Sequence, residues 1–157
     1  IKYINEYIET YPEIKVIGHP KSKLNNISEI NYLPMEDSSI FKLGSLEIKI
    51  IHTPGHYYDS VCFLVENVIF TGDTLFIGRT GRTLSKGSNV SDLYNSVYKK
   101  LLNLPGNTII YPGHNYGSKP TMTISENVKI SNLLQASGEK DFIDRMKNYE
   151  KTSVNNS

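Results

Sequence analysis

Apolar side chains recur along the chain with two different periods, and the longer period predicts its helices. A spacing of three or four residues is typical of an amphipathic helix. The segments with this spacing are residues 1–11, 91–104, 124–134 and 139–150. Pro12 ends the first segment, and Ser91 with Asp92 forms a capping signal at the start of the second. We therefore expect four helices, three of them in the second half of the chain.

Short apolar runs between these segments predict β-strands. The runs cover residues 14–19, 46–53, 60–67, 68–73 and 107–111, with a hairpin expected at Glu66 and Asn67. Polar or glycine-rich segments, residues 20–45 and 72–88, are expected to be loops, and the tail 151–157 is expected to be frayed. Strands with intervening helices predict an α/β or α+β layered domain.

Length and composition narrow the class of protein. A chain of 157 residues is expected to form a single domain, residues 1–157. A net charge of +1 gives no reason to expect a nucleic-acid or membrane partner. No apolar run approaches the roughly 20 residues that a membrane-spanning helix needs. The single cysteine, Cys62, excludes an internal disulfide framework, so we expect a reducing compartment, the cytoplasm or an organellar matrix.

Three of the strand-like runs end in a turn that carries a residue able to bind metal. The runs read IIHTPGH, VIFTGD and IIYPGH, and they present His56, Asp73 and His114. Each residue alone is an ordinary turn residue, and His19 and His52 are interpreted as structural. Two neutral imidazoles with one carboxylate, however, suit Zn²⁺, Mn²⁺ or Fe²⁺. The recurrence of the pattern therefore predicts a metal site.

The same motifs carry a resemblance to a known family. TPGH, TGDTLF, GRT and YPGH, in this order, resemble the second half of a metallo-β-lactamase-fold protein over roughly residues 14–135. The glyoxalase II-like thioester hydrolases and the persulfide dioxygenases are the most similar branches. The resemblance implies a four-layer αββα sandwich with metals along one edge. It also implies that His56 binds the first metal, His114 the second, and Asp73 both, as the catalytic carboxylate. One or two zinc ions are expected, with iron or manganese as alternatives.

The chain departs from the family pattern in three places. The upstream His-x-His-x-Asp-His motif has no match in residues 1–55, and the chain starts at Ile1 without an initiator Met. We therefore expect the N-terminal part of the fold to be missing from a longer protein. Where relatives carry GRTD and TPGS, this chain has Leu84 in place of the acid and Tyr57 and Tyr58 after the first PGH.

Arginine is scarce, and its placement predicts a recognition role. Arg79 and Arg82 lie within four residues of each other in a glycine-rich loop, in a chain that otherwise uses lysine. A planar guanidinium binds carboxylates through two hydrogen bonds. Arg82 is expected either to contact an anionic arm of the substrate, such as a glutathione carboxylate, or to tie down its loop. Tyr116 is expected either to line the substrate pocket or to pack, and the Tyr57–Tyr58 pair is expected to pack.

Three functions remain open at this point. The first is a metal-dependent hydrolase of thioesters or similar acyl bonds, with a small thiol-derived substrate. The second is an Fe²⁺ persulfide dioxygenase, and the third is a non-catalytic or inactive fragment of such a domain. The Pro-Gly-His turn, in place of the Pro-Ala-His associated with the dioxygenases, favours the hydrolase. We expect the isolated chain to be inactive, and the sequence leaves its oligomeric state open.

Overall fold

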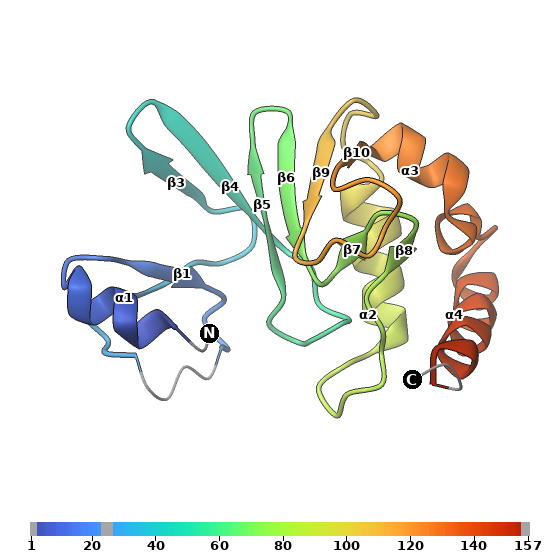
Figure 1. Cartoon of the computed structure of the whole chain (residues 1–157), viewed down its shortest axis with the longest axis horizontal. Helices are drawn as coiled ribbons and strands as arrows, with labels where there is room; N and C mark the ends of the chain where they lie inside the picture. The colour runs from blue at the N-terminus through green and yellow to red at the C-terminus, as the bar shows by residue number, and fades with distance from the viewer. Residues whose placement is uncertain (1–2, 23–26, 155–157) are drawn as a thin grey trace.

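The computed structural model describes residues 3–22 and 27–154 (Figure 1). Within these residues, one sheet contains the strands β3 (Ile40–Leu43), β4 (Leu46–His52), β5 (Val61–Val65), β6 (Val68–Gly72), β9 (Ile109–Pro112) and β10 (Met122–Thr123). Two smaller sheets pair β1 (Val16–Gly18) with β2 (Tyr32–Pro34) and β7 (Leu75–Phe76) with β8 (Arg79–Thr80). The helices are α1 (Ile4–Thr10), α2 (Val90–Tyr94), the π-helical η1 (Asn95–Leu101), α3 (Ile124–Ile130), the 3₁₀-helical η2 (Asn132–Gln135) and α4 (Glu139–Val154).

The strand order of the central sheet is β10-β9-β6-β5-β4-β3. Strand β5 is antiparallel to both β4 and β6, so β4 and β6 run in the same direction. Strand β9 is parallel to β6. The carboxyl ends of β4, β6 and β9 therefore meet at one edge of the sheet, and each of these strands leads into one of the three motif turns.

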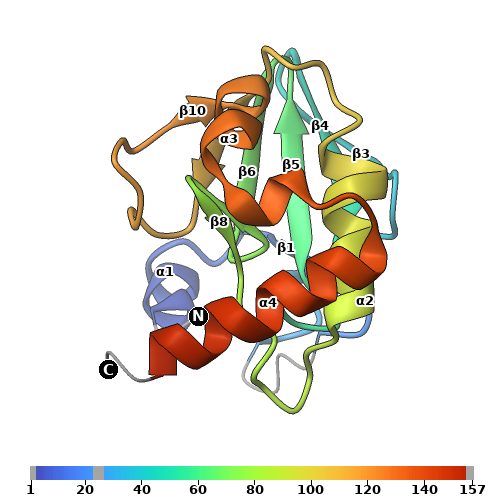
Figure 2. The same cartoon turned by 90° about the vertical axis from the view of Figure 1, so that its right-hand side faces the viewer.

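One face of the central sheet is covered by α2, η1, α3 and α4 (Figure 2). Its side chains Ile69 and Ile110 pack in a core with Leu93, Val97 and Phe142, and each of the five is at most 1% exposed. The helical spacing predicted this apolar stripe. No helix within the described ranges is long and apolar enough to cross a membrane.

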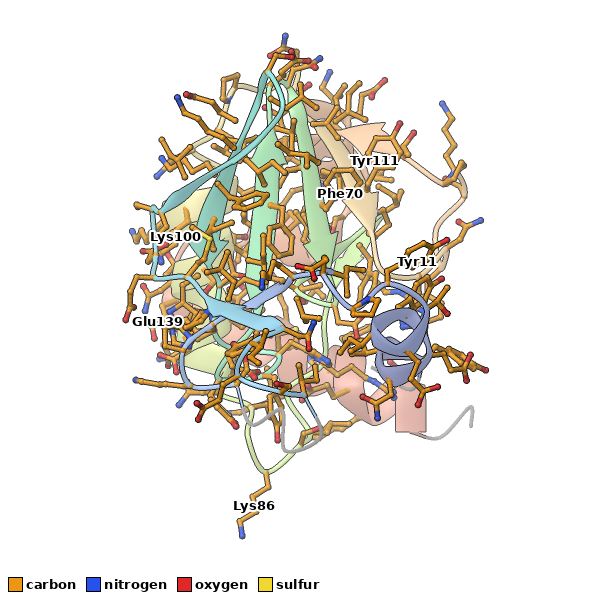
Figure 3. All side chains as sticks on the ribbon, turned by 90° about the vertical axis from the view of Figure 1, so that its left-hand side faces the viewer. Tyr11, Phe70, Lys86, Lys100, Tyr111 and Glu139 are labelled. Atoms are coloured by element: carbon orange, nitrogen blue, oxygen red, sulfur yellow. The ribbon has the colours of Figure 1, made fainter. Side chains whose placement is uncertain are left out.

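The opposite face of the sheet is also apolar. Phe63, Phe70 and Tyr111 are register partners on neighbouring strands, so their side chains share this face. Phe70 and Tyr111 remain 47% and 42% exposed, and α1 and β1 lie on the same side of the sheet (Figure 3). A sheet with two apolar faces is typical of an inner layer of a sandwich. The predicted α/β sandwich is thereby confirmed, with one helix layer and one complete inner sheet.

Two predicted loops contain strands, so those predictions were wrong. Residues 20–45 include β2 and β3, and residues 72–88 include the β7–β8 hairpin. Strands of two to four residues are too short to show a period, because their pairing depends on the partner strand. Residues 23–26 of the first segment lie outside the described residues.

The helix predictions were correct in kind and wrong at some ends. The second helix begins at Val90, because the side chain of Asn89, not Ser91, caps it by accepting the Asp92 N–H at 3.0 Å. Helix α4 continues to Val154, so residues 151–154 are helical where a frayed tail was expected. Residues 155–157, like residues 1 and 2 of the first predicted helix, lie outside the described residues.

His19 and His52 form a stacked pair between β1 and β4, in agreement with their structural interpretation. The ring centroids are 3.9 Å apart and the planes differ by 16°. His19 is 5% exposed, and its Nδ1 accepts a hydrogen bond from the backbone N–H of Lys21. Burial lowers the pKa of His19 below its ordinary value, and the neighbouring His52 is the second cause of this shift. Lys21 acts in the same direction, while Glu36 and Asp59 oppose it.

The lowered pKa of His19 predicts a pH-dependent stability. The unfolded chain takes up this proton near pH ~6.5, and the folded chain takes it up only at lower pH. The contribution of neutral His19 to stability is therefore complete above that pH and falls as the pH falls below it. His19→Phe keeps a flat ring and removes the titration, so urea unfolding at pH 7.5 and 5.5 should show a smaller loss than in the wild type. Equal losses in the two proteins would contradict this assignment.

Candidate metal centre

The three motif turns bring their polar side chains together at the edge where β4, β6 and β9 end. His56 follows Pro54 and Gly55, Asp73 follows Gly72, and His114 comes two residues after β9. The Nε2 atom of His56 lies 3.8 Å from Oδ2 of Asp73, and Nε2 of His114 lies 3.4 Å from Oδ1. The predicted cluster of two imidazoles and one carboxylate is present in the structure.

Backbone hydrogen bonds between the turns hold this arrangement. The Gly113 N–H donates to the Gly72 carbonyl at 2.9 Å, which joins the turn of His114 to that of Asp73. The Gly81 N–H donates to the Thr74 carbonyl at 3.1 Å. A Cβ at Gly81 would lie 2.0 Å from the Asp73 carbonyl and 3.0 Å from the His56 ring. Only a glycine allows the β8 loop to approach both residues this closely.

The hydrogen bond of His56 fixes the state of its ring. Nδ1 lies 2.8 Å from the backbone carbonyl of Arg82. A carbonyl can only accept, so Nδ1 carries the proton and, in the neutral ring, Nε2 presents a lone pair. That lone pair faces a carboxylate oxygen of Asp73 at a distance too long for a hydrogen bond. Two acceptor atoms that face each other are stabilised by a cation between them. Proteins commonly orient a metal-binding histidine through a hydrogen bond from its other ring nitrogen to a backbone carbonyl.

The donor chemistry fits a metal, and the number of donors is small. Each imidazole faces a different oxygen of Asp73, so the carboxylate links two positions with one nitrogen and one oxygen each. Catalytic zinc sites have about three protein ligands and structural sites about four. Within residues 3–22 and 27–154, no group of three His, Cys, Asp or Glu side chains forms a complete site for one ion. This agrees with the distances from Asp73 to the two histidines, because each histidine forms only a partial site with one oxygen of Asp73.

An aromatic stack supports the ring of His114. Tyr116 stacks on that ring with centroids 5.1 Å apart, and Phe76 contacts Tyr116 edge-on at 5.2 Å. The guanidinium of Arg79 lies over the ring of Tyr116, 4.4 Å from the ring centroid. The sequence predicted specific substrate contacts for Tyr116 and Arg82, and it included Arg79 only as the second arginine of the same glycine-rich loop. The contact with Tyr116 distinguishes Arg79 from Arg82 and could not be read from the sequence.

Arg82 itself is exposed, and its backbone makes the contact with the site. The loop that follows is tied to α4, because both the N–H and the hydroxyl of Thr83 donate to the Glu150 carboxylate. Leu84 is 56% exposed. A carboxylate from a distant helix thus binds the residue that precedes Leu84.

Cys62, Tyr57 and Tyr58 lie in packed positions in the structure. Cys62 is fully buried, and its thiol lies 3.3 Å from the hydroxyl of Thr53. Burial raises the pKa of Cys62 to about 11, so the thiol stays protonated near neutral pH. Tyr57 packs against Gly87 and lies 4.7 Å from the ring of Tyr58, as expected for a packing pair.

The sequence matches the profile of the metallo-beta-lactamase superfamily over residues 6–114, well over half of the chain. The chain belongs to the metallo-beta-lactamase superfamily. Its resemblance to the hydroxyacylglutathione hydrolase branch is also confirmed. The probable hydroxyacylglutathione hydrolase glo2 of Schizosaccharomyces pombe is 34% identical over 155 residues, covering 95% of this chain and 55% of that protein.

Two further relatives within the superfamily bear on the site. The probable polyketide biosynthesis zinc-dependent hydrolase BaeB of Bacillus velezensis is 31% identical over 113 residues, covering 72% of this chain and 50% of that protein. The crystal structure of ETHE1 from Myxococcus xanthus superposes with a TM-score of 0.78 at 29% identity, covering 92% of this chain and 62% of that one. This chain spans about half the length of the curated relatives that it matches. Superfamily membership and the zinc-dependent relative support metal binding.

Proposed function

We propose that this domain belongs to a metal-dependent hydrolase of thioesters of the acyl-glutathione type. The observation that carries the proposal is the carboxylate of Asp73 between two imidazoles, each facing a different oxygen at 3.8 and 3.4 Å. A carboxylate in this position can bind two ions at once. The relatives named as hydroxyacylglutathione hydrolase and zinc-dependent hydrolase support both the reaction class and zinc as the metal.

In this proposal, His56, Asp73 and His114 hold the zinc. Bound there, the metal would supply Lewis acidity toward the thioester carbonyl and a hydroxide near neutral pH. The Arg82 carbonyl keeps Nδ1 of His56 protonated and so directs Nε2 toward Asp73. Tyr116 holds the plane of the His114 ring and forms a wall of the substrate site, while the exposed guanidinium of Arg82 is available to an anionic group of the substrate.

The persulfide dioxygenase is the second candidate. Two histidines with one carboxylate are also the ligand set of non-haem Fe²⁺ oxygenases, and the similarity to ETHE1 favours this reading. That ligand set, however, gathers three donors on one ion, whereas here the two imidazoles lie on different oxygens of Asp73. The placement of the two imidazoles at different oxygens of Asp73 favours the hydrolase.

The ligand count predicts the behaviour of the 157-residue chain. With two protein donors at each position, we expect weak binding of at most one zinc ion and no turnover, as for an inactive portion of the domain. Calorimetric titration with zinc, together with hydrolysis of a hydroxyacyl-glutathione thioester, measures both quantities. Tight binding of two ions or full hydrolysis by this chain would contradict the ligand count.

The protein that carries this domain tests the function itself. We expect its zinc form to hydrolyse the thioester, and its Fe²⁺ form to show no oxygen uptake with glutathione persulfide. Oxygen uptake without thioester hydrolysis would select the second candidate. The absence of both activities would contradict the proposed function.

A further inference from the structure

A cavity lies between the β7–β8 hairpin and the helices η2 and α4, and its lining residue Arg79 contacts Tyr116, the neighbour of His114. Its volume is about 560 Å³, within the usual range for small-ligand sites. Six of its eight lining residues have polar side chains. The polar residues are Arg79, Asn132, Arg145, Asn148, Tyr149 and Thr152. Two of the three arginines of the chain therefore face one cavity.

The charge of Arg145 is already compensated. Its Nε and Nη2 atoms donate to the two oxygens of Asp141 at 2.9 and 3.0 Å. These hydrogen bonds lower the pKa of Asp141 to about 2, so the pair stays ionised at neutral pH. The remaining Nη1 atom donates to the carbonyl and side-chain oxygens of Asn132. Arg145 therefore fixes the wall of the cavity and contributes little net charge.

Arg79 differs, because its contacts are with neutral groups. It is partly buried, its Nη1 donates to the hydroxyl of Tyr149 at 3.3 Å, and its guanidinium lies over Tyr116. Across residues 3–22 and 27–154, no carboxylate pairs with it. A guanidinium stays charged at all ordinary pH values and binds carboxylates through its planar fork. A partly buried cation without a counter-ion attracts an anion.

Arg79 is also connected to the metal centre through a single ring. Tyr116 contacts both the guanidinium of Arg79 and the His114 ring, at 4.4 and 5.1 Å from its ring centroid. An elongated substrate can therefore reach the metal cluster with one end and Arg79 with the other. An acyl-glutathione has this form, because its thioester lies at the end of one arm and its two carboxylates lie on the others.

We propose that Arg79 and this cavity form the subsite for a substrate carboxylate. The inference rests on the proposed function for its choice of substrate, and it assigns specificity to a residue outside the metal ligands. Arg79 is a binding residue in this role, with no part in the chemical step. The hydroxyl of Tyr149 orients its guanidinium, and Tyr116 holds it beside the metal cluster.

The test uses a ligand that cannot react. S-methylglutathione and its diethyl ester, in which both carboxylates are blocked, are titrated into the ¹⁵N-labelled metal-free chain and followed by NMR. We expect the wild type to bind the free acid about tenfold or more tightly than the ester, since a charge-assisted hydrogen-bonded pair is lost in the ester. Arg79→Gln should weaken binding of the acid by a similar factor and leave binding of the ester unchanged. Arg79→Lys, which keeps the charge and loses the fork, should fall between the two.

Lys86→Gln is the matched control. It removes the same charge from the extended tip of the 81–89 loop, where Figure 3 shows the side chain pointing away from the rest of the molecule. Its affinity for the free acid should equal that of the wild type. Melting curves of all variants exclude loss of folding as the cause. Equal binding of acid and ester by the wild type, or unchanged affinity in Arg79→Gln, would overturn the inference.

The zinc titration separates this inference from the proposed function. If zinc does not bind the cluster while Arg79→Gln still weakens binding of the acid, the carboxylate subsite stands and the hydrolase proposal fails. If zinc binds and Arg79→Gln has no effect on the acid, the subsite fails alone.

Discussion

Asp73→Asn in the protein that carries this domain should abolish metal-dependent hydrolysis and lower the metal content. An amide has one acceptor oxygen and no charge, so it cannot replace a carboxylate whose two oxygens face two imidazoles. Loss of metal-based charge stabilisation, worth several kcal/mol, corresponds to a rate reduction of about 10³-fold or more. Metal analysis and steady-state kinetics on the same preparation measure both effects.

The stability of the metal-free Asp73→Asn protein should stay close to that of the wild type. The carboxylate is partly exposed. The Nε2 atom of His56 lies 3.8 Å away, beyond hydrogen-bond distance, and that of His114 lies 3.4 Å away. Asp144→Asn provides the control, because it makes the same chemical change at an exposed ion pair on α4. Normal metal content and turnover in Asp73→Asn would remove Asp73 from the site. A large loss of stability without metal would show that the residue is structural.

The grouping of His56, Asp73 and His114 could be predicted because the local sequence marks each of the three residues. Each of the three residues follows an apolar run and a glycine-containing turn, and both features are visible in a single segment. The parallel direction of β4, β6 and β9 then places the turns at one edge. To predict this grouping it is enough to locate the end of each strand, and the exact register between the strands is not required.

The surroundings of the cluster depend on contacts between distant segments, and the sequence did not reveal them. The stack on His114 joins Arg79 to Tyr116, and Tyr149 of α4 completes it from 70 residues away. The buried amide of Asn127 is a similar case. It accepts from the Gly78 N–H at 2.7 Å and donates to the Phe76 carbonyl at 2.9 Å, and so fixes the β7–β8 hairpin from α3. These partners have no shared periodicity or motif, because only tertiary packing brings them together.

Gly55→Ala is expected to have the largest effect on folding. Gly55 has φ +139°, a backbone conformation that residues with a side chain rarely adopt. An added Cβ would also lie 2.3 Å from both the Cα and the backbone N of Leu93, and the helical backbone there cannot move away as a side chain could. The carbonyl of Gly55 further accepts the Asn89 N–H at 2.8 Å, at the start of α2. Steric overlap and backbone strain together should cost about 3 kcal/mol or more.

Urea unfolding measures this cost, and Gly138→Ala is the matched control. A Cβ at Gly138 meets no atom within 4 Å, and its φ is not in the positive range, so this variant should unfold close to the wild-type midpoint. Gly55→Ala should unfold at a much lower urea concentration. Because His56 is the next residue, any fraction that folds should also bind zinc more weakly. Equal unfolding midpoints for the two alanine variants would show that α2 can shift to make room for the new methyl group. The Pro54–Gly55 turn would then not fix the position of His56.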